Sequence, residues 1–254
     1  GMRVRGEFPN QEDDVFIPLS LIEQCSSKLL ELDDADGMQF VSLGVDVARF
    51  GDDETIIYRN YHGHCKIVRN RRGQNLMATV GDIVQEFKKI YREHPTYESK
   101  VYVQIDDTGL GGGVTDRLKE VRKEQKLYKM QVIPINAAEK IETDTAAGKD
   151  AAERYNNLTT AMWASMRDLL DNKQIVIEDD EQTIGQLSSR KYTMASNGKL
   201  EIEPKKEMKK RGLDSPDRAD ALALALYLGK IKKHTGSAPS VGAMKKLSKD
   251  NYWG

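Results

Sequence analysis

The feature that most constrains the fold is residues 41–58, where two apolar runs flank a short polar turn. The first run, 41–47, has the length and apolar composition of a buried β-strand, and the second run begins another strand. Asp46 is a lone carboxylate near the end of the first run. A charge buried there costs free energy unless something compensates it, and a metal ion is a common compensator. The simpler alternative is that Asp46 caps the turn that follows.

The rest of the chain predicts a meander of three strands, followed by strands that alternate with helices. We expect strands at 39–47, 55–61, 64–69, 101–105, 131–135 and 175–177. We expect the main helices at 74–93, 114–124, 151–170, 179–189 and 218–231. This order is typical of an α/β fold whose sheet contains both antiparallel and parallel strands.

The two ends of the chain differ in composition from this central region. Residues 1–38 are interpreted as a lead-in with one short helix at 19–32, which an acidic turn ends. Residues 233–254 contain Gly, Ser, Pro and Lys, which predicts a flexible tail. We therefore predict one main domain over 39–232, interrupted by a polar, mobile segment at 141–148.

Composition narrows the classes of function. The net charge is −1, from 39 basic and 40 acidic residues, so a surface that binds nucleic acid must be local. Cys25 and Cys65 have neither metal-ligand nor disulfide spacing, which predicts reduced thiols in an intracellular protein. The four histidines are scattered, which argues against a zinc site. No apolar run reaches membrane-spanning length, and we recognise no signal peptide.

Three carboxylates occupy comparable places in the expected fold. Asp46 ends the first strand and Asp106 the fourth, and a helical crossover would place these two strands side by side. Asp220 lies one turn into the last helix, three residues after Asp217, so both lie on one helix face. Carboxylates that converge in this way suit hard cations such as Mg²⁺ or Mn²⁺, and two such ions can promote phosphodiester hydrolysis. The alternative for Asp217 is charge stabilisation of the helix N-terminus.

The glycine-rich segment 109–113 fits neither common nucleotide-binding motif. A dinucleotide fingerprint would need glycine where the chain has Val114, and no Gly-Lys pair has the context of a Walker A loop. The glycines are expected to let the backbone approach a phosphate or a metal ion closely.

A β-hairpin and a basic run precede the last helix. Residues 190–194 and 199–203 flank the pair Asn197-Gly198, which favours a tight hairpin turn. The basic run that follows is either a solvated loop or a clamp on the phosphate backbone of DNA, which would read no sequence. Its candidate contacts are Lys205, Lys206, Lys209, Lys210 and Arg211.

Three segments together resemble the C-terminal nuclease domain of tailed-bacteriophage terminase large subunits. They are 43–55, 104–111 and 215–222, and their order and spacing match over roughly residues 40 to 231. The resemblance implies a ribonuclease H-like α/β fold: a mixed sheet with a three-strand meander, flanking helices and an added hairpin. It also implies an endonuclease that depends on Mg²⁺ or Mn²⁺, with two ions, and cuts double-stranded viral DNA during genome packaging in the host cytoplasm.

Carried over by position, the resemblance assigns Asp46, Asp106 and Asp220 as catalytic metal ligands. Asp217 falls where some family members have another acidic residue or a histidine, so it is a further candidate ligand. The hairpin resembles one that controls access of DNA to the family's active site. Residues 1–38 then resemble the end of a linker from an N-terminal packaging ATPase that is absent here. A portal and a small terminase subunit would be partners of the whole protein.

Other functions share parts of this pattern. Another ribonuclease H-like nuclease, such as a junction resolvase or a transposase core, would use the same carboxylates. An actin-like or sugar-kinase ATPase also opens with a Gly-Val-Asp strand, but it needs a phosphate-binding hairpin that residues 49–52 do not provide. A DNA-binding or docking module without catalysis is the remaining alternative. Comparing cleavage of linear duplexes with cleavage of four-way junctions would distinguish a terminase-like nuclease from a junction resolvase or transposase core. Any catalytic turnover would exclude a DNA-binding or docking module without catalysis.

Overall fold

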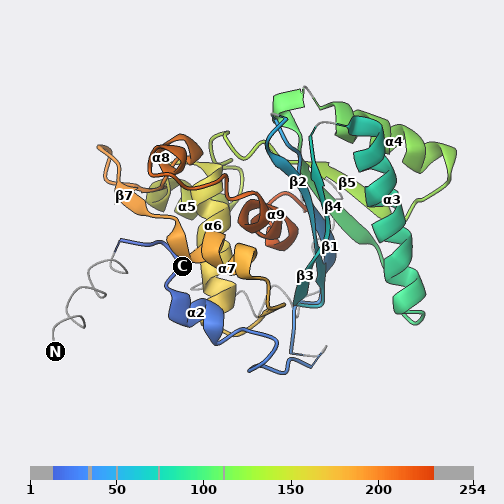
Figure 1. The fold of residues 1–254 in the computed structure, drawn as a ribbon, viewed down its shortest axis with the longest axis horizontal. Coiled ribbons are helices and arrows are strands. Elements are labelled where there is room, and N and C mark those ends of the chain that lie inside the picture. Colours follow the sequence, from blue (N-terminus) through green and yellow to red (C-terminus); the bar gives the residue numbers. More distant parts are fainter. Residues whose placement is uncertain (1–13, 34–35, 50, 74, 111, 232–254) are drawn as a thin grey trace.

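Figure 1 shows a computed structural model of the chain, which describes residues 14–33, 36–49, 51–73, 75–110 and 112–231. Its centre is a six-stranded sheet with the order β5-β4-β1-β2-β3-β6. The strands are β1 (Val41–Asp46), β2 (Glu54–Tyr61), β3 (His64–Arg72), β4 (Val101–Asp106), β5 (Met130–Pro134) and β6 (Val176–Ile177). The helices include α2 (Leu19–Glu23), α3 (Leu76–Glu93), α4 (Gly113–Glu124), α5 (Ala146–Arg154), α6 (Leu158–Asp171), α7 (Glu181–Ser189), α8 (Lys205–Lys210) and α9 (Asp217–Leu226).

The predicted mixed sheet is confirmed. β1 pairs antiparallel with β2, and β2 pairs antiparallel with β3, which is the expected meander. β4 joins the other edge of β1 in parallel, because α3 carries the chain back across the sheet before β4 begins. β5 and β6 are also parallel to their neighbours. β1 therefore lies inside the sheet, and all six of its residues are buried.

Helices cover both faces of the sheet and create two apolar cores. α3 and α4 lie on one face, and α9 lies on the other with α6 beyond it (Figure 1). The approach of α9 is unusually close, because Gly44 of β1 has no side chain to hold it away. A Cβ atom at Gly44 would lie 2.0 Å from the carbonyl oxygen of Ala221. Because glycine lacks a Cβ atom, the helix that carries Asp220 can pack directly against the strand that carries Asp46.

Polar groups in the sheet also determine where α9 ends. Gln104 Nε2 donates to the carbonyl oxygens of Leu224 and Tyr227, at 2.5 and 2.6 Å. These are carbonyls that the last turn of a helix leaves without a helical partner. α9 consequently ends at Leu226, and the expectation of one helix over 218–231 is wrong beyond that residue.

The expected helix over 151–170 is in fact two helices, α5 and α6. Asn157 interrupts the pattern, because its side chain accepts a hydrogen bond from the backbone of Thr160 and so caps a new helix. Tyr155 is extended and bridges to Leu200 instead of continuing α5. Part of the segment expected to be mobile, 141–148, is also helical, since α5 begins at Ala146.

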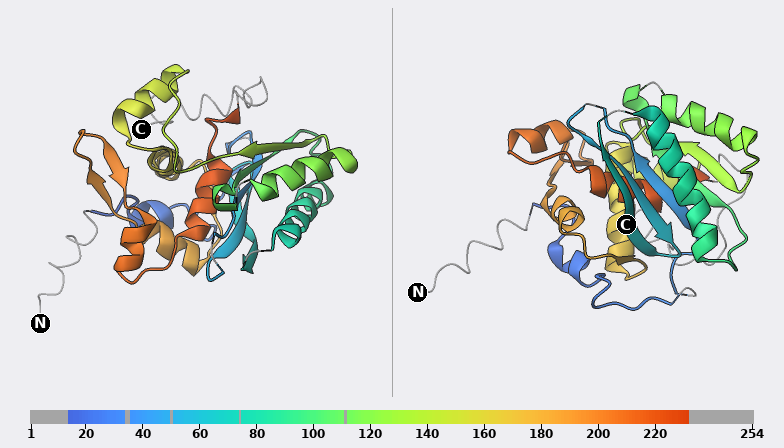
Figure 2. Two further views of the ribbon diagram at one scale, coloured as in Figure 1. Left: turned by 90° about the horizontal axis from the view of Figure 1, so that it is seen from above. Right: turned by 45° about the vertical axis from the view of Figure 1, so that its right-hand side comes forward.

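The predicted hairpin is confirmed as β7 (Tyr192–Met194) and β8 (Leu200–Ile202), a separate two-stranded sheet at the side of the molecule (Figure 2). The basic run after it forms the short helix α8. In the lead-in, the helix predicted over 19–32 is much shorter and ends with α2. The chain then turns, and the backbones of Cys25 and Ser27 form hydrogen bonds with the backbone of Ile177. The predicted tail, 233–254, lies outside the described residues.

Two further sequence expectations concern the whole chain. Cys25 and Cys65 are free and buried, as expected from their spacing. Within the described ranges, the structure has no helix with both the length and the apolar character that crossing a membrane requires.

Candidate active site

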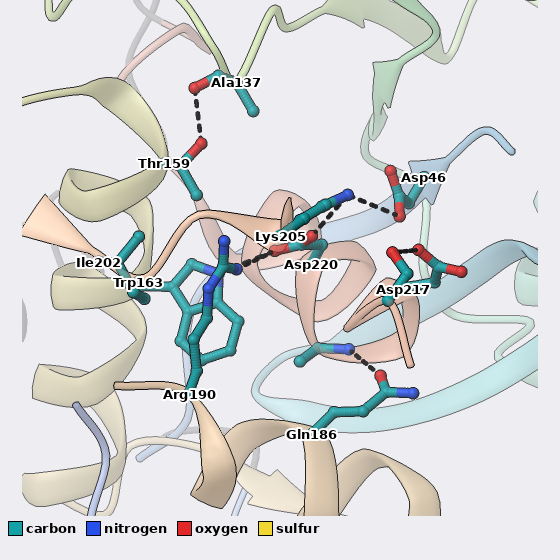
Figure 3. Close-up of polar contacts among 12 residues, drawn as sticks. Asp46, Ala137, Thr159, Trp163, Gln186, Arg190, Ile202, Lys205, Asp217 and Asp220 are labelled. Carbon is teal, nitrogen blue, oxygen red and sulfur yellow. Dashed lines mark hydrogen bonds and ion pairs between the residues drawn. The ribbon is translucent and has the colours of Figure 1, made fainter. Parts of the chain in front are cut away.

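The topology brings the four predicted carboxylates to one end of the sheet, and Figure 3 shows three of them, Asp46, Asp217 and Asp220. Asp46 and Asp106 are the last residues of β1 and β4, and they are direct neighbours in the register of this parallel pair. Asp217 is the first residue of α9 and Asp220 follows one turn later. All four residues are buried, at 7–8% exposure. The fold therefore places the four residues at the same end of the sheet, and their role as metal ligands stays a prediction.

The position of α9 is fixed from its first turn. The N-terminal N–H groups of a helix need acceptors, and here Gln186 of α7 supplies one. Its side-chain oxygen accepts hydrogen bonds from the backbone of Arg218 and Ala219, at 2.8 and 3.2 Å. Asp220 therefore projects from a helix end that α7 anchors on one side and the sheet anchors on the other.

Lys205 places a cation between two of the carboxylates. Its ammonium nitrogen lies 2.9 Å from Asp220 Oδ2 and 3.9 Å from Asp46 Oδ2 (Figure 3). Lys205 is one of the predicted contacts for DNA phosphates, but in this structure its ammonium group faces the site. It offsets part of the negative charge that the carboxylates bring together.

Asp220 has two further partners that the sequence does not reveal. Trp163 Nε1 donates to Asp220 Oδ1 at 2.9 Å, and Arg190 Nη1 donates to the same oxygen at 3.0 Å. Trp163 occurs in a helix with apolar spacing, and Arg190 looks like the first residue of a hairpin. The one available signal is indirect, because a buried carboxylate cluster requires cations or hydrogen-bond donors from somewhere in the chain.

Asp106 and Asp217 are held by neutral donors. Asp106 Oδ1 accepts from the hydroxyl of Thr108 at 2.6 Å. Asp217 Oδ1 accepts from the hydroxyl of Ser215 at 2.6 Å, and its Oδ2 accepts from the backbone N–H of Glu54 at 3.2 Å. Asp217 thus fixes the start of β2 against α9, which is a structural role in addition to its place in the cluster.

The neighbouring acidic residues are engaged in the fold. Asp107 Oδ2 accepts a hydrogen bond from the backbone of Thr115 at 2.8 Å, near the N-terminus of α4. Asp53 belongs to the turn after β1, as predicted, and lies 3.8 Å from Lys209. Asp107 is not among the residues that line the cavity over the other carboxylates, so we do not count it among the candidate ligands.

Burial and charge act differently on the carboxylates. Burial raises the pKa of Asp46 well above its ordinary value, and neighbouring carboxylates add to this effect while Lys205 opposes it. Burial raises the pKa of Asp217 as well. Burial also acts to raise the pKa of Asp220, but Lys205 and Arg190 outweigh it and hold this pKa below its ordinary value. The surroundings therefore favour the ionised form of Asp220 and disfavour that of Asp46.

The donor set suits a hard divalent cation. Carboxylate oxygens are the preferred protein ligands of Mg²⁺ and Mn²⁺, and Lys205 already shows that a cation is stable between Asp46 and Asp220. Within the described residues, no three acidic, histidine or cysteine side chains are yet close enough to hold an ion together. Because like charges repel, we expect the carboxylates to draw together when an ion binds.

A cavity of about 640 Å³ opens over the carboxylates. The four aspartates line it, together with Lys205, Lys206 and Lys209 of α8. Residues of α6 and the hairpin region also line it, among them the apolar Met162 and Ile202 and the polar Thr159 and Arg190. The other two basic candidates have local partners, because Lys210 pairs with Glu207 and Arg211 pairs with Glu203.

The chain matches no family model and no curated protein sequence. Among solved structures, it is similar to the nuclease domain of the large terminase subunit gp2 of bacterial virus Sf6. The TM-score is 0.64 at 17% identity, and the match covers 84% of this chain and 98% of that domain. A lysine-to-alanine mutant of the same domain, solved with manganese, gives a TM-score of 0.62 at 18% identity, covering 84% and 99%.

A third similar structure is the lysine-to-alanine mutant of the Sf6 domain solved with calcium, with a TM-score of 0.61 and 18% identity over 84% of this chain and 99% of that one. The mixed sheet and its flanking helices therefore form the fold of terminase nuclease domains, as the sequence resemblance predicted.

Proposed function

We propose that this chain, which has the fold of a phage terminase nuclease domain, is a metal-dependent endonuclease acting on double-stranded DNA. The observation that carries the proposal is the convergence of Asp46, Asp106, Asp217 and Asp220 over one cavity. Such a concentration of buried carboxylates costs stability, and a bound divalent cation would offset that cost. The manganese and calcium ions with which the similar Sf6 domains were solved support the same chemistry.

The proposed ligands are Asp46, Asp106 and Asp220, with Asp217 as a further ligand. When bound, Mg²⁺ or Mn²⁺ supplies Lewis-acid stabilisation of the scissile phosphate and lowers the pKa of the attacking water. We propose two ions, because a pair can stabilise both the attacking and the leaving oxygen. Asp46 is the ligand that gains most from a bound cation, since burial makes its ionisation unfavourable without one.

The chain itself performs the remaining tasks. Lys205 balances the charge of Asp46 and Asp220 when no ion is present. Lys206 and Lys209 line the cavity, where they can bind the phosphates that flank the cleaved bond. DNA is thereby positioned through its backbone, without recognition of sequence.

The biological setting rests on the resemblance. We propose that the nuclease acts on viral DNA during genome packaging in the host cytoplasm, as part of a longer terminase subunit. In that protein, an ATPase domain, a portal and a small subunit would be its partners, and residues 1–38 would lead from the ATPase. A junction resolvase or transposase core remains an alternative for the same site, and it would cut four-way junctions in preference to linear duplexes.

The test is plasmid cleavage by the full chain with Mn²⁺. We expect Asp46→Asn to reduce cleavage by more than about 100-fold while circular dichroism shows an intact fold, since even residues that support metal ligands contribute about 10–100-fold. The matched control is Asp52→Asn, which removes an exposed carboxylate from the turn after β1 and should cut like the wild type. Undiminished cutting by Asp46→Asn would reject the proposed function.

A further inference from the structure

We propose that Arg190 and Trp163 are positioning residues for Asp220, which hold one carboxylate oxygen so that the other faces the cation. The inference rests on the proposed function and names two residues that the sequence resemblance did not assign. Both residues donate to Asp220 Oδ1, at 3.0 and 2.9 Å, from different elements of the fold. Figure 3 shows both side chains reaching Asp220 from the side away from Asp46.

Arg190 is held rigidly enough to act in this way. It is 2% exposed, and its Nε atom donates to the carbonyl oxygen of Glu203 at 2.9 Å. Its guanidinium carbon lies 4.8 Å from the centre of the Trp163 ring, so the indole covers one face of the guanidinium group. A planar group with fixed partners presents its remaining N–H to Asp220 in one orientation.

Trp163 contributes a donor that carries no charge. It is fully buried in α6, and a buried indole N–H requires an acceptor, which here is Asp220. Since the indole cannot accept a proton or a hydrogen bond at this nitrogen, it fixes Oδ1 as an acceptor. The two donors therefore saturate Oδ1 and leave Oδ2 toward Lys205, which is 2.9 Å away.

Arg190 also joins Asp220 to the hairpin. Arg190 lies just before β7, and Glu203 directly follows β8, so the guanidinium group closes the base of the hairpin. The backbone of Phe16 in the lead-in donates to the carbonyl oxygen of Arg190 at 2.8 Å. The orientation of Asp220 is thus set by the hairpin base and by the segment that leads into the domain.

The test is the affinity of the metal-free full chain for Mn²⁺, measured by the electron paramagnetic resonance signal of free Mn²⁺. The variants are Arg190→Lys and Trp163→Phe, which keep the net charge of the site while removing the planar guanidinium group or the indole donor. We expect each to weaken Mn²⁺ binding by about tenfold, in line with residues that orient metal ligands elsewhere. Arg59→Gln is the matched control, because it removes a buried arginine that pairs with Glu93 away from the site.

The control separates positioning from a general loss of stability. Arg59→Gln should lower the melting temperature and leave Mn²⁺ affinity unchanged. Wild-type affinity in both folded site variants would overturn the inference while leaving the proposed function intact. If Arg190→Lys does not fold, Trp163→Phe decides, because phenylalanine retains most of the ring. Absence of Mn²⁺ binding by the wild type would overturn the proposed function, and this inference with it.

Discussion

Two regions of this molecule bury acidic side chains. In one region the acidic residues are paired with arginines, and in the other the carboxylates outnumber the cations that contact them. On the α3 face, Asp82 and Glu86 are 8% and 3% exposed. Arg69 and Arg71 of β3 pair with them at 2.8 to 3.3 Å. The candidate active site holds four buried aspartates, but Lys205 and Arg190 form ion pairs with only two of them, Asp46 and Asp220.

The difference shows what each region contributes. Balanced pairs on the α3 face fix the helix against the sheet, and removing one partner leaves an uncompensated charge. The surplus of carboxylates at the site opposes stability, as the raised pKa of Asp46 indicates. A region whose negative charge is only partly compensated is a candidate for binding a cation. On the α3 face the acidic side chains already have arginine partners, so no further cation is required.

The largest expected effect is the difference in stability when the same substitution, Asp→Asn, is made in each of the two regions. Asp82→Asn should destabilise the metal-free protein by about 1–2 kcal/mol, because Arg69 and Arg71 lose a charged acceptor. Asp46→Asn should leave the stability unchanged or raise it, because it removes a carboxylate whose ionisation burial disfavours. Urea unfolding in EDTA measures both. A larger loss for Asp46→Asn than for Asp82→Asn would show that the two regions do not differ as described.

A second, smaller effect concerns the basic helix beside the site. Replacing Lys206 and Lys209 together by glutamate should weaken binding to any DNA duplex at low salt by about tenfold, because both lysines line the cavity. The companion variant Lys210→Glu should cost less, since that lysine is not among the residues that line the cavity. Fluorescence anisotropy with labelled duplexes of unrelated sequence gives both values. Unchanged binding by the double variant would reject the phosphate clamp.

The smallest effect tests a carboxylate that belongs to neither region. Burial raises the pKa of Asp168 in α6 to about 7, and its Oδ2 has no hydrogen-bond partner among the described residues. Because the folded state binds this proton more tightly than the unfolded state, wild-type stability should fall as the pH rises from about 4 to about 7. Asp168→Asn should remove that loss and gain less than about 1 kcal/mol at pH 8, but little at pH 4.

Thermal unfolding of wild type and Asp168→Asn at several pH values measures this difference. An equal gap between the two proteins at pH 4 and pH 8 would contradict it. A gap that widens with pH would show that buried acidic groups outside the two regions also cost stability when they are left without a cation.

Much of the fold could be predicted because local patterns determine it. The apolar runs and turn residues locate the strands, and a helical crossover makes β4 a parallel neighbour of β1. That step alone places Asp46 beside Asp106, with no knowledge of the packing around them. The position of Asp220 follows from its place one turn inside an apolar helix.

The remaining features depend on contacts between distant residues. The break between α5 and α6 could not be predicted, because Tyr155 fits a helical pattern and its bridge to Leu200 is tertiary. The end of α9 depends on Gln104 in another element. The roles of Trp163 and Arg190 depend on packing between α6, the hairpin base and α9, which no spacing in the sequence encodes.

The central claim is that the surplus of carboxylates at the end of β1 and β4 exists to bind divalent cations. The most direct measurement is anomalous diffraction at the manganese edge from crystals of the full chain soaked in Mn²⁺. The predicted result is anomalous density in contact with Asp46, Asp106 and Asp220. Density confined to other acidic residues, with none at these three, would contradict the claim.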